Sequence, residues 1–202
     1  MLKEKFETLC RNFSEDEELI TELWEKIETF HGETSRHYHT LQHLEHIYKE
    51  LESFELSPLV EFAIFYHDIV YDASQHNNEE VSVLYAMKHL NRLGVKQVLQ
   101  DELLGLILAT KTHSSTVAEH LLFLDADLAI LGSNTEIYIQ YINNVRKEYS
   151  IYDDDTYKKG REKVLKNFLE KERIYLSEHF YKLYENKARK NLEQELKMFY
   201  SL

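Results

Sequence analysis

Glycine, proline and cysteine are scarce in this chain. Its 202 residues include five glycines, one proline and one cysteine. Hairpins and bulges depend on glycine, so a protein built from β-sheets would need more of it. The single cysteine, Cys10, has no partner for a disulfide within the chain. These shortages favour an all-helical fold that is stabilised by its apolar core, for which the chain is long enough.

Basic side chains and long apolar runs are also lacking. Lys and Arg number 24 against 36 Asp and Glu, which gives a net charge of −12. Proteins that bind nucleic acid polymers or anionic membranes do so through basic side chains, so we expect neither partner. The N-terminus lacks the apolar core of a signal peptide, and no segment approaches the roughly 20 apolar residues of a membrane span. We therefore expect a soluble, cytoplasmic protein.

Apolar residues recur at helical spacing along most of the chain. The length fits one domain, residues 1–202. Ser14 followed by Glu17 is a capping box, and Ser57 with Pro58 pairs an N-cap with a first-turn proline. Four helices are predicted to begin near residues 14, 57, 137 and 153. Five others are predicted over residues 41–51, 79–93, 101–111, 117–131 and 177–200. The helix from residue 57 is apolar nearly all round and is predicted to lie centrally and to continue into the segment FYHDIVYD.

Histidine is common, with eleven copies, and stands near carboxylates in four segments: RHYHTLQHLEH, FYHDIVYD, KTH and DADL. His39 and His43 are four residues apart, which places both on one face of a helix. His67 and Asp68 are adjacent inside an apolar stretch. Each of these residues alone has an ordinary structural explanation, such as a hydrogen-bonded core histidine, but their joint presence indicates a common site.

The segment DADL supplies the last carboxylate, from either Asp125 or Asp127. Both stand among apolar residues, and carboxylates are seldom fully buried without a partner. Imidazole together with carboxylate suits divalent first-row metals. A site of two histidines and two aspartates would leave positions on an octahedral ion for water and a substrate oxygen.

The order H…HD…D resembles the HD superfamily of metal-dependent phosphohydrolases. The segments RHYHTLQH, FYHDIVYD, NNEEVS, ATKTH, DADLAILG, VRKEY and GREKVLKNFL resemble a bacterial branch described as predicted HD-superfamily phosphohydrolases, from about Arg36 to the C-terminus. The resemblance implies a compact HD-domain helical bundle with additional C-terminal helices. It also implies a divalent ion (Mg, Mn, Co, Ni, Fe or Zn) and a small phosphorylated substrate. The implied ligands are His43, His67, Asp68 and Asp127, with Asp125 as the alternative to Asp127.

Hydrolysis of a phosphate ester also needs a proton donor or base and positive charge for the phosphate. Asp72 and Glu79 follow the HD pair and are candidates for the first role, although Glu79 also suits the first turn of a helix. Arg36 and Lys111 are candidates for the second role. The predicted substrate-binding residues are His39, His113 and Arg146, and His39 has the alternative role of a metal ligand.

The sequence therefore predicts a metal-dependent phosphohydrolase that acts on a phosphate ester, with a nucleotide as one candidate substrate. Two other functions stay open. One is a di-iron HD-type oxygenase, which would use His39 and His113 as extra ligands. The other is a non-catalytic module that senses a nucleotide or a small anion. A homodimer is also left open.

Overall fold

The computed structural model describes residues 2–200, and this part of the chain is all-helical with no strand. The all-α prediction is confirmed. None of the helices in residues 2–200 combines the length and apolar character that spanning a membrane requires. The elements are α1 (Leu2–Arg11), α2 (Glu17–His31), α3 (Leu41–Glu50), α4 (Pro58–Tyr66), α5 (Asn78–Arg92), α6 (Gln97–Ala109), α7 (Ala118–Asp127), the 3-10 helix η1 (Ala129–Gly132), α8 (Thr135–Glu148), α9 (Asp154–Glu170) and α10 (Glu178–Met198).

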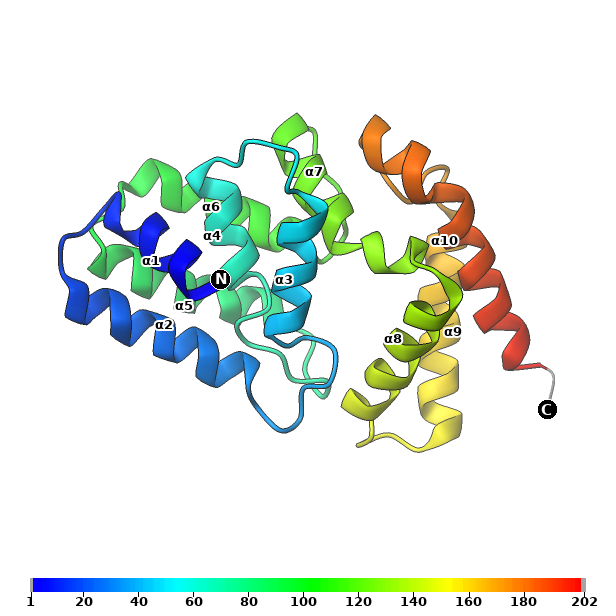
Figure 1. Ribbon diagram of the computed structural model, residues 1–202. Coiled ribbons are helices and arrows are strands. Elements are labelled where there is room, and N and C mark those ends of the chain that lie inside the picture. The colour runs from blue at the N-terminus through cyan, green and yellow to red at the C-terminus, as the bar shows by residue number, and fades with distance from the viewer. Residues whose placement is uncertain (1, 201–202) are drawn as a thin grey trace.

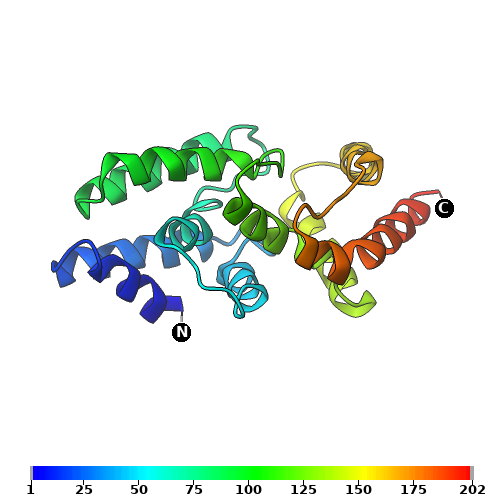
Figure 2. The same ribbon diagram turned by 90° about the horizontal axis from the view of Figure 1, so that it is seen from above.

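The helices form two groups, which Figure 1 shows side by side. The N-terminal group contains α1 to α7, and the C-terminal group contains α8 to α10. The short helix η1 leads from α7 to α8 and packs against α10. Figure 2, seen from above, shows the same division.

Helix α4 lies at the centre of the N-terminal group and contacts α1, α3, α5, α6 and α7. Its residues 62–66 are fully buried, because the helix is apolar on every side. Ser57 caps it as predicted, with its Oγ accepting from the Val60 amide at 3.4 Å. The central position predicted for this helix is therefore confirmed.

The prediction that α4 continues into FYHDIVYD is wrong, because the helix ends at Tyr66. The buried guanidinium of Arg36 donates to the carbonyl oxygens of Asp68 at 2.6 Å and Ile69 at 2.7 Å. In a continuing helix those carbonyls would accept from amides one turn later. Arg36 thus satisfies the backbone of a turn, and His67 and Asp68 lie where the chain leaves the helix.

Other helix ends also differ from the prediction. Helix α1 was not predicted, although Leu2, Phe6 and Leu9 form an apolar stripe that is buried in the core. Helix α2 is capped by Asp16, whose carboxylate accepts from the Leu19 amide at 2.9 Å, and Ser14 only accepts from the Asp16 amide. The helix predicted over residues 117–131 is divided into α7 and η1.

Candidate metal centre

Four side chains converge at the face of the N-terminal group that is turned toward α8. His43 comes from α3, His67 and Asp68 follow α4, and Asp127 ends α7. His43 Nε2 lies 3.2 Å from His67 Nε2 and 3.1 Å from Asp127 Oδ1. His67 Nε2 lies 3.1 Å from Asp68 Oδ2. Adjacent ligands on an octahedral ion with bonds of about 2.1 Å are about 3 Å apart, so this donor set fits a divalent ion.

The protonation of His67 explains why the cluster needs a cation. Its Nδ1 lies 3.2 Å from the Ala63 carbonyl oxygen and 3.1 Å from that of Ile64. A carbonyl only accepts, so Nδ1 carries the proton and the lone pair of Nε2 faces the carboxylates of Asp68 and Asp127. Such an arrangement is repulsive unless a proton or a metal ion lies between these atoms.

The electrostatics of the cluster agree with this demand for positive charge. Burial opposes a charge on His67, but the neighbouring Asp68 and Asp127 raise its pKa well above the usual value. Burial likewise opposes ionisation of Asp127, but hydrogen bonds from His113, His43 and His67 lower its pKa well below the usual value. A bound divalent ion would supply the same positive charge that a proton supplies without it.

The two aspartates of DADL have different surroundings. Asp125 is buried, and its two oxygens accept from the backbone amides of Leu176 at 2.8 Å and Ser177 at 2.6 Å. Those contacts tie α7 to the start of α10 and occupy the carboxylate. Asp127 instead contacts three imidazoles. The geometry thus brings Asp127 into the cluster and leaves Asp125 out of it.

His39 does not lie on the helix of His43, as the four-residue spacing predicted. Helix α3 begins at Leu41, with Thr40 as its N-cap. The loop before it still brings His39 Nε2 to 3.9 Å from Asp68 Oδ2. His39 Nδ1 lies 2.8 Å from Glu148 Oε2, so Nδ1 donates and Nε2 is the atom that faces the candidate metal centre.

Glu148 is a functional candidate that the sequence did not reveal. Its Oε1 accepts from the backbone amides of His37, Tyr38 and His39 at 2.7 to 2.9 Å. Burial opposes its charge, but the His39 imidazole and these amides lower its pKa to about 2. From the sequence, Glu148 is a plausible surface partner for Arg146. In the structure, Arg146 pairs with Asp154 at 2.6 Å, and Glu148 holds the loop that carries His39.

His113 extends the cluster on the side of Asp127. Its Nε2 lies 3.0 Å from Asp127 Oδ2. Its φ is +47°, a left-handed conformation that is uncommon for a residue other than glycine. Such strain is often found at functional sites, where the surrounding structure maintains it.

The other predicted residues do not join the cluster through their charged atoms. The Arg36 guanidinium contacts backbone carbonyls behind the HD turn. Lys111 is exposed and binds Glu80 at 2.6 Å and the His76 carbonyl at 2.9 Å. Asp72 is exposed, and its Oδ1 accepts from the amide and hydroxyl of Ser74.

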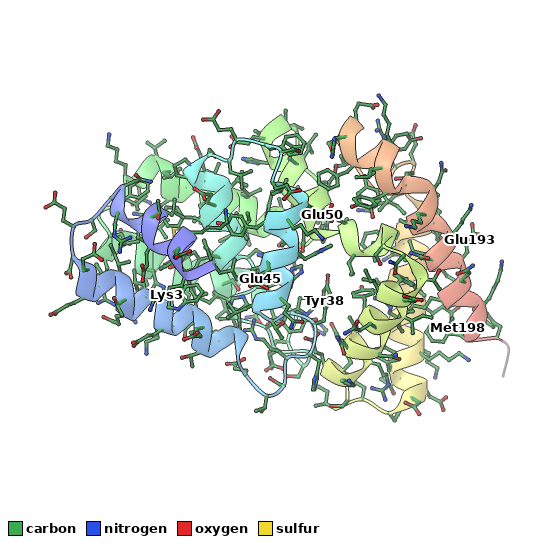
Figure 3. All side chains as sticks on the ribbon, viewed as in Figure 1. Lys3, Tyr38, Glu45, Glu50, Glu193 and Met198 are labelled. Carbon is green, nitrogen blue, oxygen red and sulfur yellow. The ribbon has the colours of Figure 1, made fainter. Side chains whose placement is uncertain are left out.

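The cluster lines a cavity of about 210 Å³, which we call the inner chamber. Glu79 also lines it, so of the two carboxylates predicted for proton transfer only Glu79 is near the centre. Tyr38 lies on this side of the N-terminal group in Figure 3, and its ring meets that of Tyr141 from α8 at a centroid distance of 4.7 Å. The walls are formed by Tyr38, His39, His67, Asp68, Tyr71, Glu79, Thr110, His113, Asp127, Leu128, Ile130, Leu131, Tyr141, Arg161, Val164 and Phe168.

The chain matches no protein-family model, no curated protein and no solved structure among those compared. Membership of the HD superfamily therefore stays a prediction from the sequence motifs. The candidate metal centre rests on the geometry of its own side chains, of which His43, His67 and Asp68 offer ligand atoms within 4.8 Å of one another.

Proposed function

We propose that this chain is a metal-dependent phosphohydrolase of the HD type, with the ion held by His43, His67, Asp68 and Asp127. The observation that carries the proposal is the position of His67 Nε2, which faces the partly buried carboxylates of Asp68 at 3.1 Å and Asp127 at 3.6 Å. A bound divalent ion would lower the pKa of a coordinated water from about 15.7 towards 7 and neutralise charge on phosphate oxygens. A small phosphate ester is a substrate that needs both effects.

The residues around the ligands suit the remaining tasks. His39, oriented by Glu148, and His113 flank the cluster, so we assign them to the substrate oxygens. Glu79 lines the inner chamber without belonging to the ligand cluster. We assign it to proton transfer at the leaving oxygen.

Positive charge for the phosphate comes from fewer side chains than the sequence indicates. Arg36 and Lys111 are engaged elsewhere. Arg161 lines the inner chamber, although its guanidinium also pairs with Glu195 at 2.7 Å. The ion, the flanking imidazoles and Arg161 are therefore the groups we assign to the phosphate.

The test combines metal analysis with activity. The purified chain is analysed for bound metals and assayed against phosphomonoesters, phosphodiesters and nucleotides with Mg, Mn, Co and Ni. We expect His67→Ala and Asp68→Asn to lower kcat/KM by at least about 100-fold, because each removes a ligand. Asp72→Asn is the matched control and should retain activity, since its exposed carboxylate accepts from Ser74 and does not line the inner chamber. Turnover that survives both ligand substitutions would overturn the proposal.

One observation favours a second function, a di-iron HD-type oxygenase. His39 and His113 place an additional imidazole beside Asp68 and Asp127, which would suit two bridged ions. Two irons per chain, together with oxygen consumption and no phosphate release, would favour the oxygenase over the hydrolase.

A further inference from the structure

A second cavity lies directly beside the inner chamber. It has a volume of about 420 Å³, and we call it the outer chamber. Its wall contains the rings of Tyr71, Tyr141, Tyr149, Tyr152 and Tyr157. The two chambers share part of their walls, namely His39, Tyr71, Tyr141, Arg161 and Val164. A ligand with one end at the metal centre would therefore have its other end among the tyrosines.

The tyrosine rings are held in place by one another and by cations. Tyr149 lies nearly parallel to Tyr152 at a centroid distance of 6.3 Å and meets Tyr157 at 6.0 Å. The Arg146 guanidinium lies 4.7 Å from the centre of the Tyr157 ring. Tyr71 stacks on His39 at 3.8 Å. Fixed rings bind a flat partner at a low cost in conformational entropy.

The residues described in the wall of the outer chamber offer no carboxylate to a ligand. No Asp or Glu is among the described residues that line it, although the whole chain has a net charge of −12. Arg161 is its one lining Lys or Arg within residues 2–200, and Glu195 balances that charge. The Tyr157 hydroxyl is buried and has no hydrogen-bond partner among residues 2–200, so the ring of Tyr157 is the part that the chamber presents to a ligand.

We propose that the outer chamber binds an uncharged, planar aromatic group that is linked to the anion at the metal centre. The aromatic group stacks on Tyr149 and Tyr157, and the anion lies in the inner chamber. This inference rests on the proposed function for the anionic end of the ligand. Together the two cavities have the size of an ordinary small-molecule site.

The test uses two phosphonates that share an anion and differ in one ring. Binding of benzylphosphonate and cyclohexylmethylphosphonate to the Mn-loaded full chain is measured by calorimetry. We expect benzylphosphonate to bind about tenfold more tightly, the size of an aromatic stacking contribution. Tyr149→Leu and Tyr157→Leu should each reduce that preference to about twofold or less.

Two controls separate loss of stacking from loss of structure. Phe at position 149 or 157 keeps the ring and should keep the preference for benzylphosphonate. Tyr181→Leu removes a partly exposed tyrosine of α10 that does not line either chamber, and it should leave the preference unchanged. Circular dichroism checks that each variant is folded.

The outcomes distinguish this inference from the proposed function. Equal binding of the two phosphonates, or no binding of either, overturns the aromatic site. A preference for benzylphosphonate without hydrolysis of any phosphate ester supports the aromatic site and overturns the hydrolase. Hydrolysis of benzyl and cyclohexylmethyl phosphate with equal kcat/KM supports the hydrolase and overturns the aromatic site.

Discussion

At the scale of single residues, Glu148 supports the candidate metal centre through four hydrogen bonds to the segment His37–His39. One of its carboxylate oxygens accepts hydrogen bonds from three backbone amides, and the other accepts a hydrogen bond from the His39 imidazole. We expect Glu148→Gln to lower the free energy of unfolding by about 1–3 kcal/mol, because a buried ionic acceptor becomes neutral. It should also lower kcat/KM about 10- to 100-fold, since the His39 ring loses its orientation.

Urea denaturation and steady-state kinetics check this prediction. Glu136→Gln on the exposed side of α8 is the matched control and should change neither quantity. An unchanged unfolding free energy for Glu148→Gln would contradict the supporting role that we assign to the hydrogen bonds of this carboxylate.

His31 makes stability depend on pH. The ring is buried, its Nδ1 donates to the Ile27 carbonyl at 2.9 Å, and burial together with nearby Arg36 lowers its pKa to about 3. In the unfolded chain its pKa is about 6.5. Between these values only the unfolded chain binds the proton, so stability falls as the pH drops below 6.5, by up to about 1.4 kcal/mol per unit.

The comparison of His31→Gln with the wild type measures this contribution. The variant has no imidazole at position 31, so it should lose less stability between pH 7 and pH 5. Urea midpoints in the presence of EDTA give both losses. Equal losses in the two proteins would show that His31 does not titrate differently on folding.

The candidate ligand residues were easier to predict from the sequence than the residues that support them. His43, His67, Asp68 and Asp127 carry a recognisable chemistry in a recognisable order, and the structure brings them together. Glu148 acts through backbone amides that are about 110 residues away in the chain. Such a partnership depends on how α8 packs, and neither residue type nor spacing encodes it.

At the scale of elements, the end of α4 decides the position of two candidate metal ligands, His67 and Asp68. The guanidinium of Arg36 donates to the carbonyls of His39, Asp68 and Ile69. We expect Arg36→Lys to weaken binding of Mn about 10- to 100-fold, because one ammonium group does not span the same carbonyls. Calorimetric titration with Mn measures the change.

A second arginine serves as the control for this prediction. Arg92 of α5 pairs with Glu22 of α2 in an exposed ion pair at 2.6 Å, so Arg92→Lys keeps a charge between two helices. Mn binding should be unchanged in that variant, since exposed pairs contribute little. Comparable losses in the two variants would exclude a specific role for Arg36.

Helix boundaries were harder to predict than helices. The apolar period identified most of the helical segments, because it records which face is buried. It did not locate the end of α4, because the apolar residues Ile69 and Val70 follow the helix. The turn there depends on Arg36, which binds the carbonyls of Asp68 and Ile69 from a distant part of the chain. Local signals also misplaced the start of α2, because Ser14 and Asp16 are both good capping residues and Asp16 is the one that caps.

At the scale of the whole molecule, the C-terminal group completes the site. Helices α8 and α9 supply Tyr141, Glu148, Tyr157 and Arg161 to the walls and supports of the two chambers, and Tyr149 follows directly after α8. Helix α10 is tied to α7 and η1 through Asp125 and through Asn191, which donates to the Leu131 carbonyl at 2.8 Å. The candidate metal ligands thus come from one group of helices, and the walls of the two chambers come from both.

A metal ion held only in the folded state should stabilise the whole molecule. Binding contributes RT ln(1 + [L]/Kd), about 2.7 kcal/mol when the free ion is at 100 times its Kd. For a chain of this size we expect Tm to rise by about 5–10 °C when Mn is added to EDTA-treated protein. The same ion also removes the repulsion among the lone pairs of His67, Asp68 and Asp127.

Differential scanning calorimetry on three proteins tests whether that stabilisation arises at the proposed centre. Wild type and Asp72→Asn should show the full rise in Tm, because the exposed Asp72 carboxylate accepts from Ser74 and lies outside the ligand cluster. Asp68→Asn should show little or none, since it removes one ligand and one of the two charges that attract the ion. An equal rise in Asp68→Asn would mean that Mn acts elsewhere on this acidic surface. The His67 lone pair would then be satisfied by a proton alone, and the cluster would be a structural ion pair.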